Sequence, residues 1–467
     1  MKTSLFTKKT RIDEPVEAVF AWHERPGAIE RLSPPWDSIK LVSQSNGINP
    51  GSKVRLKISA LGPLRINWTA RHVGYEKNRL FQDIQETGPF SHWKHTHRFI
   101  PDGQNACVIE DRIEYALPFH PVTTTVFGTL VRSRLDRIFT YRHETMAADI
   151  ADHRKYALKP SRILISGSNG LIASTLIPFL TTGGHKVCRL LRTPPGAVSD
   201  CFYFNPVDGI IDTENMEAFD VVIHLAGENI GNGPWTEKKK RRIMESRTKS
   251  TALLAEAIAK MKKPPKLFIC ASAIGYYGDR GKEYLDESSP PGDDFISAVC
   301  KAWEESATPA INAGIRTVFL RIGVALTPEG GALQKLLPLF KAGLGGKIGS
   351  GEQYLSWISI DDVACGILHL MANQNIEGPV NLVSPTPLTN NDFSKKTGQV
   401  LSRPAFFTVP STAIKMFFGE MGKETVLSST RVIPEKLLAS GYRFRHPDLE
   451  SALSHLLGIT RQRNNGL

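Results

Sequence analysis

The sequence has few cysteines and no long apolar run. Its six cysteines, at positions 107, 188, 201, 270, 300 and 365, form no C-x-x-C pair, so reduced thiols are expected. No uncharged apolar stretch reaches about 18 residues, and the N-terminal sequence MKTSLFTKKTRIDEP lacks the apolar core of a signal peptide. We therefore expect a cytoplasmic protein without a membrane span.

Motifs for nucleic-acid binding are also missing, although the net charge is +12. The basic residues are spread along the chain, and no zinc-finger, RNP or basic-zipper pattern accompanies them. The densest basic cluster, residues 238–242, is typical of a solvated helix face. Because no such motif is present, we expect no nucleic-acid partner. The positive charge also suits an anionic small molecule.

The sequence does contain enough apolar material for a sizeable core. Apolar residues make up 41% and charged residues 22% of the 467 residues, which excludes global disorder. There is no internal repeat and no G-X-Y period. The length suggests two or three structural units.

The first block, residues 1–157, combines one early helix, several strands and a long final helix. Strand-like runs separated by turn residues are expected at 4–12, 39–43, 53–59, 64–75, 79–86, 92–101 and 106–116. From about Thr125 to Tyr156, apolar residues recur at helical spacing. This order predicts an α+β unit in which a curved antiparallel sheet grips the final helix.

Two histidines share one face of a strand in this block. Trp93, His95, His97 and Phe99 alternate along the strand and therefore point to the same side. Two histidines at this spacing can bind a metal ion, but no carboxylate or cysteine lies at a useful spacing from them. We expect no metal, and expect these histidines to line a cavity or to lie in the core.

The second block, residues 158–403, alternates strands and helices. Strands are expected at 162–166, 186–191, 221–225, 267–271 and 317–322, with helical stretches between them. This alternation predicts a Rossmann-type α/β unit with a doubly wound parallel sheet. Residues 404–460 are expected to form a small, mainly helical extension, and residues 461–467 a frayed tail.

The strongest motif is the run ILISGSNGLIAS at residues 163–174. It places a G-x-x-G-x-x-A turn after an expected strand and before an expected helix, which is the context of a dinucleotide-binding turn. The pyrophosphate is then expected at the helix N-terminus. The cofactor-binding residues expected here are Gly167, Ser168, Asn169, Gly170, Leu171 and Ile172; an ordinary tight turn is the alternative.

The choice of cofactor depends on the end of the second strand. NAD sites usually carry an acidic residue about 20 residues after the glycines, where this sequence has Arg189 and Arg192. A guanidinium group can pair with a 2′-phosphate, so NADP is expected rather than NAD, unless both arginines are solvated. Further along, small residues at strand ends leave room for a dinucleotide; the expected contacts are Leu225, Ala226, Gly227, Glu228 and Ala271.

Several motifs resemble a known family. The second block resembles the atypical, extended short-chain dehydrogenase/reductase family, also described as NAD-dependent epimerase/dehydratase-like proteins, in the runs GSNGLIA, HLAGENI, LRIGVALTPEGGAL and SGEQYLSWISIDD. The run RVIPEKLLASGYRFRHPDLESAL resembles the domain of unknown function that ends those proteins. The resemblance covers about residues 160–460.

The first block is similar to another family. Its runs VEAVFAWHERPGAIERLSPPW and IEDRIEYALPF resemble the START-like, polyketide cyclase-related SRPBCC superfamily. This resemblance implies a helix-grip fold with an internal cavity for an apolar ligand. It agrees with the element order expected from the sequence.

The catalytic pattern departs from that of the family. Short-chain dehydrogenases are expected to use a Ser or Thr, a Tyr and a Lys in a Y-x-x-x-K helix, but here Ser297 stands four residues before Lys301. Ser272 can supply the hydroxyl, and Tyr276 or Tyr277 can act as acid or base from a neighbouring loop, unless both tyrosines are structural. Lys301 is expected to be a surface residue.

Two functions remain open at this point. The first is an NADP-dependent oxidoreductase or epimerase that acts on a small molecule, with an apolar ligand in the first domain. The alternative is a non-catalytic NADP-binding sensor, because some relatives carry a cell-division-inhibitor label. Arg321, at a strand end, is expected either to hold an anionic substrate or to pair with Asp361 or Asp362. Oligomeric state is left open.

Overall fold

The computed structural model describes residues 3–37, 39–45, 47–61, 64–119, 122–194, 196, 200–214 and 216–459; the expected tail lies outside them. The chain divides into two compact units. The first comprises Met1–Ala157, Pro178–Gly184 and His455–Leu467, and the second comprises Leu158–Ile177 and His185–Ser454. Each unit is described by itself.

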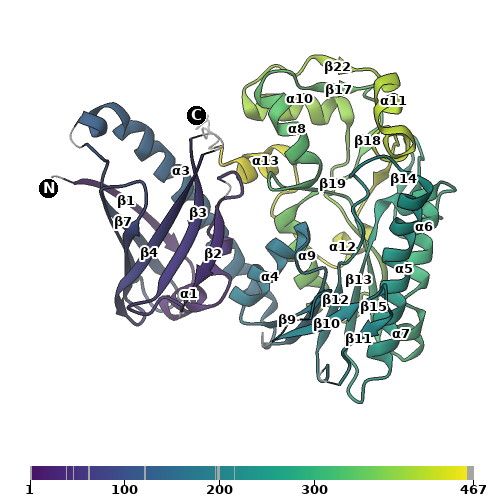
Figure 1. The fold of residues 1–467 in the computed structure, drawn as a ribbon, viewed down its shortest axis with the longest axis horizontal. Helices are drawn as coiled ribbons and strands as arrows, with labels where there is room; N and C mark the ends of the chain where they lie inside the picture. Colours follow the sequence, from purple (N-terminus) through teal and green to yellow (C-terminus); the bar gives the residue numbers. More distant parts are fainter. Residues whose placement is uncertain are drawn as a thin grey trace. The chain divides into compact units, whose positions relative to one another are not determined.

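The first unit contains a seven-stranded antiparallel sheet and a long helix (Figure 1). Its strands are β1 (Ser4–Ile12), β2 (Lys40–Gln44), β3 (Lys53–Leu61), β4 (Leu64–Glu76), β5 (Leu80–Thr87), β6 (His92–Pro101) and β7 (Cys107–Ala116). Its helices are α1 (Val16–Glu24), α2 (Ala28–Arg31) and α3 (Val122–Tyr156). The strand order is β1-β7-β6-β5-β4-β3-β2. All seven expected strands are confirmed, with ends that shift by one or two residues.

The core of this unit lies on the inner face of the sheet. Phe20 and Trp22 from α1 pack with Phe99 from β6, and Leu135 and Phe139 from α3 belong to a second apolar cluster on the same sheet. Alternate residues of each strand point inward, which is why the apolar period of two along β6 is buried. Burying each such large side chain contributes about 1.5–3 kcal/mol.

The second unit contains an eight-stranded sheet. Its strands are β8 (Arg162–Ser166), β9 (Lys186–Leu191), β10 (Cys201–Asn205), β11 (Ile210–Ile211), β12 (Val221–His224), β13 (Leu267–Ala273), β15 (Arg316–Ile322) and β20 (Gly378–Leu382). The order is β11-β10-β9-β8-β12-β13-β15-β20, and every pair except β10–β11 is parallel. This is a doubly wound sheet whose strand order reverses between β8 and β12.

The five strands expected in this block are confirmed, but the sheet has further strands that the sequence pattern missed. β20 begins with Gly378 and Pro379, two residues that disfavour a strand. It lies at an edge of the sheet, where proline is tolerated because one side of the strand needs no partner. Local propensity therefore does not indicate this strand, whose position is decided by its pairing with β15.

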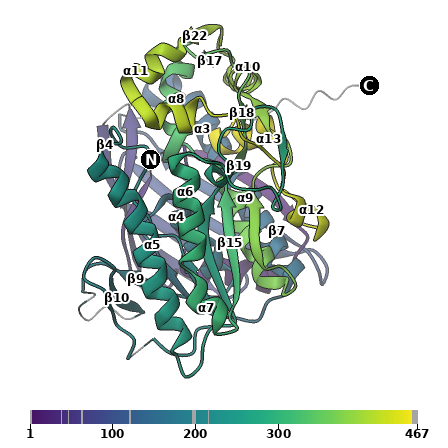
Figure 2. The same cartoon turned by 90° about the vertical axis from the view of Figure 1, so that its right-hand side faces the viewer.

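Helices cover both faces of this sheet. α5 (Glu237–Ala259), α6 (Phe295–Glu305) and α7 (Thr308–Asn312) lie along one face, whereas α4 (Leu171–Thr182) and α9 (Ile360–Ala372) lie on the other (Figures 1 and 2). The C-terminal extension is not purely helical. Besides α11 (Ser411–Met421), α12 (Glu435–Ala439) and α13 (Leu449–Leu457), it adds β22 (Phe407–Val409) and β23 (Arg431–Val432), each paired with an earlier short strand.

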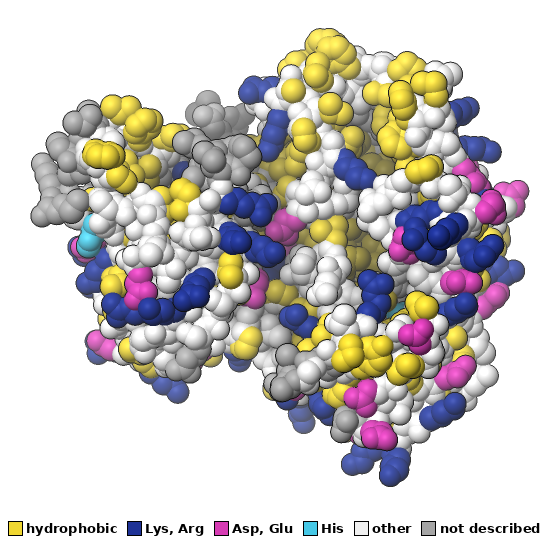
Figure 3. Space-filling view, viewed as in Figure 1, with side chains coloured by type: hydrophobic (Ala, Val, Ile, Leu, Met, Phe, Trp, Pro, Cys, Tyr) yellow, Lys and Arg dark blue, Asp and Glu magenta, His cyan; other side chains and the backbone are white. Residues whose placement is uncertain are grey.

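Among the helices of the described residues, none combines the length and apolar character that crossing a membrane requires. All six cysteines are described, and none forms a disulfide. On the face shown in Figure 3, Lys and Arg side chains are scattered among other side chains rather than gathered in one patch.

Candidate functional site

The glycine turn lies between β8 and α4, where the strand order of the parallel sheet reverses. Gly167 has a φ of +70°, and a Cβ added there would lie 2.7 Å from the backbone of Leu225 and Ala226. The Gly170 N–H donates to the Gly167 carbonyl at 2.9 Å, which closes the turn before α4 begins. Glycine is required at position 167 because both the positive φ and the close approach of the neighbouring chain exclude a side chain.

This turn presents a buried polar side chain that has no hydrogen-bond partner in the described part of the chain. Ser168 is only 7% exposed, and its hydroxyl has no hydrogen-bond partner among the described residues. Asn169 and Gly170 are exposed, and the first turn of α4, all of it described, contains no acidic side chain. A helix N-terminus with free N–H groups favours an anion. The turn from Gly167 to Ile172 therefore fits a pyrophosphate.

Two exposed arginines mark the carboxyl end of β9. Arg189 lies on the strand and Arg192 follows it directly, and both side chains are exposed. Lys186, on the same strand, pairs with Asp200 at 2.7 Å. Neither arginine pairs with a carboxylate in the described part of the chain, so both guanidinium groups are available to an anionic ligand.

The segment after β12 continues this edge of the sheet. Leu225 and Ala226 are half-buried beside the glycine turn, and Gly227 is exposed. Glu228 accepts a hydrogen bond from Lys239 Nζ at 2.6 Å, and this bond lowers the pKa of the carboxyl group. Glu228 is thus held as a carboxylate, which disfavours a role as a proton donor.

The end of β12 is braced by a neutral histidine. His224 is fully buried, and its two ring nitrogens lie 2.5 Å from Ser166 Oγ and 3.0 Å from Ser250 Oγ. Burial lowers the pKa of His224 to about 3. The ring therefore ties β12 to β8 and to α5 without adding charge beside the glycine turn.

Arg247, on α5, is a candidate anion-binding residue that the sequence analysis missed. Its guanidinium group lies 3.3 Å from the position of a Cβ at Gly227 and 4.9 Å from the ring centroid of Trp303. It forms no ion pair with a described residue, and burial lowers its pKa. Nothing in the sequence marks it, because it is one of many basic residues on a helix and only the fold places it beside Gly227.

The expected hydroxyl at the end of β13 takes part in a buried ionic network. Ser272 Oγ donates to Glu304 Oε1 at 2.7 Å. Arg321 donates to both carboxylate oxygens of Glu304, each at 2.9 Å. The expectation that Arg321 pairs with Asp361 or Asp362 is therefore wrong: Glu304, on α6, takes that place. Ala271, an expected cofactor contact, is buried within β13 and only 6% exposed.

The two neighbouring tyrosines, on the 3₁₀ turn η1 (Ile274–Tyr277), differ in burial. Tyr277 is 0% exposed, donates to Asn381 Oδ1 at 2.6 Å and accepts from Arg321 at 3.1 Å. Burial raises the pKa of Tyr277 to about 12. Tyr277 therefore belongs to the scaffold. Tyr276 is partly exposed, and its ring lies under the Arg321 guanidinium group, 3.4 Å from centroid to Cζ.

The helix that would carry a Tyr-x-x-x-Lys pattern is α6. Ser297 is buried, and its hydroxyl donates to the carbonyl of Gly275 at 3.0 Å. Lys301 is exposed, as expected. Ser297 thus supports η1 from beneath, and α6 contributes Glu304 rather than a catalytic tyrosine.

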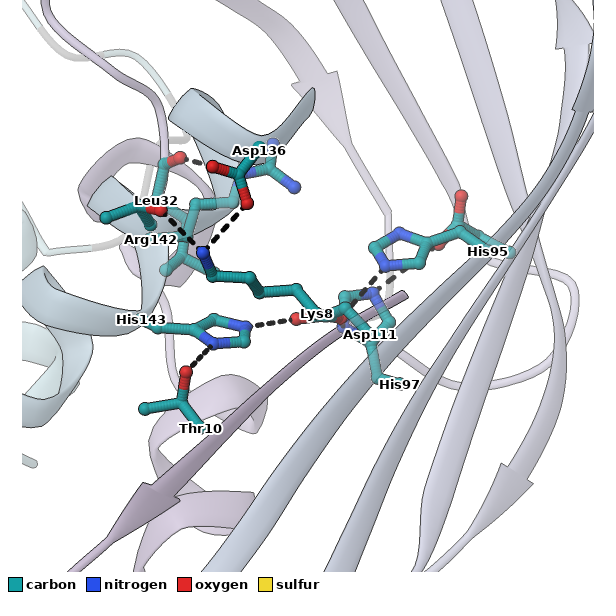
Figure 4. A network of polar contacts seen from close by, with 11 residues as sticks. Lys8, Thr10, Leu32, His95, His97, Asp111, Asp136, Arg142 and His143 are labelled. Atoms are coloured by element: carbon teal, nitrogen blue, oxygen red, sulfur yellow. Dashed lines mark hydrogen bonds and ion pairs between the residues drawn. The ribbon is translucent and has the colours of Figure 1, made fainter. Parts of the chain in front are cut away.

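A separate cavity of about 390 Å³ lies inside the first unit, between the sheet and α3. Apolar side chains such as Leu56, Trp68 and Ile138 make up most of its wall. His95 and His97 line it, as the alternation along β6 predicted. Behind them, Asp111 is bound by both rings and by His143, which in turn contacts Thr10 (Figure 4).

The parallel sheet, its reversal point and the glycine turn define a Rossmann-like α/β protein with a dinucleotide-type site. Residues 163–382 match the NAD dependent epimerase/dehydratase family, and residues 409–456 match a domain of unknown function, DUF1731. An epimerase family protein from Mycobacterium bovis is 38% identical over 293 residues, which cover 63% of this chain and 96% of the relative. The chain belongs to this epimerase family.

Solved structures are similar over part or all of the chain. The crystal structure of a nucleoside-diphosphate sugar epimerase from Corynebacterium glutamicum has a TM-score of 0.80 at 32% identity and covers 97% of this chain and 90% of that one. The human epimerase family protein SDR39U1, crystallised with NADPH, has a TM-score of 0.59 at 34% identity and covers 64% of this chain and 100% of its own.

Proposed function

We propose that the chain is an NADP-dependent oxidoreductase or epimerase that acts on a small molecule at the carboxyl edge of its parallel sheet. The observation that carries this proposal is the pair Arg189 and Arg192, which stands where NAD sites usually carry a carboxylate. A guanidinium fork suits a 2′-phosphate. The human relative crystallised with NADPH supports the same cofactor, and NAD is the less favoured alternative.

Different parts of the site would bind different parts of the dinucleotide. The turn from Gly167 to Ile172 would receive the pyrophosphate, and the Ser168 hydroxyl, which has no partner among the described residues, would donate to it. Leu225 to Glu228 would form the floor beneath the dinucleotide. When bound, the nicotinamide supplies a hydride donor or acceptor. Because one similar structure is a nucleoside-diphosphate sugar epimerase, nucleoside-diphosphate sugars are the first substrate class to screen.

Replacing Arg192 by alanine is expected to weaken NADPH binding about ten- to a hundredfold and to leave NADH binding unchanged. The loss corresponds to one charge-assisted contact with the 2′-phosphate, about 1.5–3 kcal/mol. Calorimetric titration of the full chain measures both affinities. Lys186→Ala, on the same strand but paired with Asp200, is the control and should bind NADPH normally. Equal losses for NADPH and NADH would contradict the role of Arg192.

Replacing Tyr276 by phenylalanine is expected to lower turnover about 10²- to 10⁴-fold, the usual contribution of an acid–base group. Tyr276 is chosen because it is the partly exposed tyrosine of η1, whereas Tyr277 is buried. With a substrate found by the screen, turnover is measured as NADPH oxidation for a reductase and as formation of the epimeric product for an epimerase, which causes no net NADPH oxidation; calorimetry checks that NADPH affinity is retained. Tyr284→Phe is the control, because Tyr284 is the exposed residue of the short strand β14 (Tyr284–Leu285). Unchanged turnover would remove Tyr276 from the mechanism.

For the first unit we propose an SRPBCC-type, helix-grip domain that binds an apolar ligand. The mainly apolar cavity of about 390 Å³ supports this assignment, because ligand sites of proteins usually fall in the range of about 300–1,000 Å³. The long helix α3 against a seven-stranded sheet agrees with such a fold. The six free cysteines support our further proposal of a reducing, cytoplasmic location.

One observation favours a second function, a non-catalytic NADP-binding sensor. The place of the family tyrosine is taken by the buried Ser297, and the Ser272 hydroxyl is engaged by Glu304. A sensor would bind NADPH without turning over any substrate of the screen. NADPH binding that shifts on occupation of the first unit, with no turnover, would favour it over the enzyme.

A further inference from the structure

We propose that the inner wall of the cavity in the first unit is a binding site for a divalent transition-metal ion, held by Asp83, His95 and His97. Asp83 lies on β5 directly opposite His95 on β6, and His97 follows two residues later on the same face. One ligand atom from each residue lies within 4.8 Å of the other two. Two imidazoles and one carboxylate are a donor set that suits Zn²⁺ or Fe²⁺.

The distances from Asp83 to the two histidines fit those between metal ligands. Asp83 Oδ2 lies 3.5 Å from His95 Nδ1 and 3.7 Å from His97 Nε2. Both distances exceed the length of an N–H···O hydrogen bond, about 2.7–3.2 Å. They are close to the ligand–ligand edge of a tetrahedral site, about 3.4 Å when each ligand lies about 2.1 Å from the ion.

A second carboxylate orients both rings from behind. Asp111 Oδ1 lies 2.9 Å from His95 Nε2 and 2.6 Å from His97 Nδ1, the nitrogens that face away from Asp83. Asp111 Oδ2 is bound in turn by His143 Nε2 at 2.5 Å (Figure 4). A carboxylate on the outer nitrogen of a metal-binding histidine fixes its tautomer and strengthens it as a ligand.

The remaining coordination positions would open into the cavity. Asp83, His95 and His97 all line it, whereas Asp111 does not. His72 lines it beside Asp83, and its Nδ1 has no hydrogen-bond partner among the described residues. Three protein ligands with an open position are typical of a catalytic rather than a structural metal. An ion here would bind an oxygen atom of an otherwise apolar ligand.

From the sequence alone no metal is expected, because no carboxylate or cysteine lies at a useful spacing from the two histidines along the chain. Asp83 and His95 are far apart along the sequence. Only the antiparallel register of β5 and β6 brings them face to face.

The test is a calorimetric titration of the full chain, after chelator treatment, with Zn²⁺ and separately with Co²⁺. We expect one ion per chain. Asp83→Asn should weaken binding at least a hundredfold, and Asp111→Asn about ten- to a hundredfold, the usual cost of losing an outer-shell carboxylate. His92→Gln, on the outer face of β6, is the matched control and should bind like wild type. No binding by wild type, or equal binding by Asp83→Asn, would overturn the site.

A second measurement covers the case in which Asp83→Asn does not fold. X-ray absorption of wild-type protein loaded with one equivalent of Zn²⁺ should show two imidazole ligands; a shell without imidazole would overturn the site. The site does not depend on the nucleotide function, so a folded Asp83→Asn variant should retain NADPH affinity. Failure of the metal site and failure of the NADP site are thereby distinguished.

Discussion

Replacing Glu304 by alanine is expected to lower the free energy of unfolding by about 3–5 kcal/mol. Glu304 is 12% exposed and receives two hydrogen bonds from Arg321, which is 3% exposed. Without this carboxylate, a buried guanidinium group is left without its counter-charge, and Ser272 also loses its acceptor. Urea-induced unfolding followed by circular dichroism measures the loss.

Two further variants show whether loss of the buried Glu304–Arg321 ion pair causes the drop in the free energy of unfolding. Glu305→Ala, one residue away and exposed, removes the same group from the same helix and should change stability by less than about 0.5 kcal/mol. A double replacement, Glu304→Leu with Arg321→Met, should recover much of the loss because it removes both charges together. If Glu304→Ala is no less stable than Glu305→Ala, the network does not stabilise this fold.

Replacing Gly167 by alanine is expected to weaken NADPH binding at least a hundredfold. The added Cβ would lie 2.7 Å from the backbone of Leu225 and Ala226, so the turn has to move away from β12. That movement takes the Ser168 hydroxyl and the backbone N–H groups of the turn out of place. Losing two charge-assisted hydrogen bonds, each about 1.5–3 kcal/mol, accounts for a loss of affinity of this size. Fluorescence titration with NADPH measures the dissociation constants of both proteins.

Gly209 provides a control for backbone strain alone. Its φ is +69°, nearly the same as that of Gly167, but a Cβ there meets no atom within 4 Å. Gly209→Ala should therefore lower the free energy of unfolding by about 1–2 kcal/mol, the cost of the positive φ, and should leave NADPH affinity unchanged. Similar NADPH affinities of the two variants would show that close approach at Gly167 is unimportant for the site.

Much of the secondary structure could be predicted from local pattern. The period of two along β6 and the apolar spacing along α3 were visible in the sequence, because each element buries one face and repeats at its own interval. The glycine turn was visible for a different reason: a positive φ and a tight strand–helix connection require glycine at that position. The edge strand β20 was missed because its residues suit a strand only in that location.

The catalytic candidates show where local pattern fails. Tyr276 and Tyr277 are adjacent and identical in type, and no feature of the sequence separates them. In the fold one is partly exposed and the other is buried against Asn381 and Arg321. The partner of Arg321 was equally unpredictable, because Glu304 reaches it from α6 across the face of the sheet.

By itself the sequence determined the alternation of elements, the dinucleotide turn at Gly167 and the arginines that favour NADP. These features follow from backbone geometry and from the period of each strand, and both are set by residues that are close together in the sequence. Only the tertiary structure decided that Asp83 faces His95, that Arg247 lies beside Gly227 and that Glu304 pairs with Arg321. The physical reason is that such contacts depend on strand register and helix packing, which bring distant residues together through the burial of whole faces rather than through any local signal.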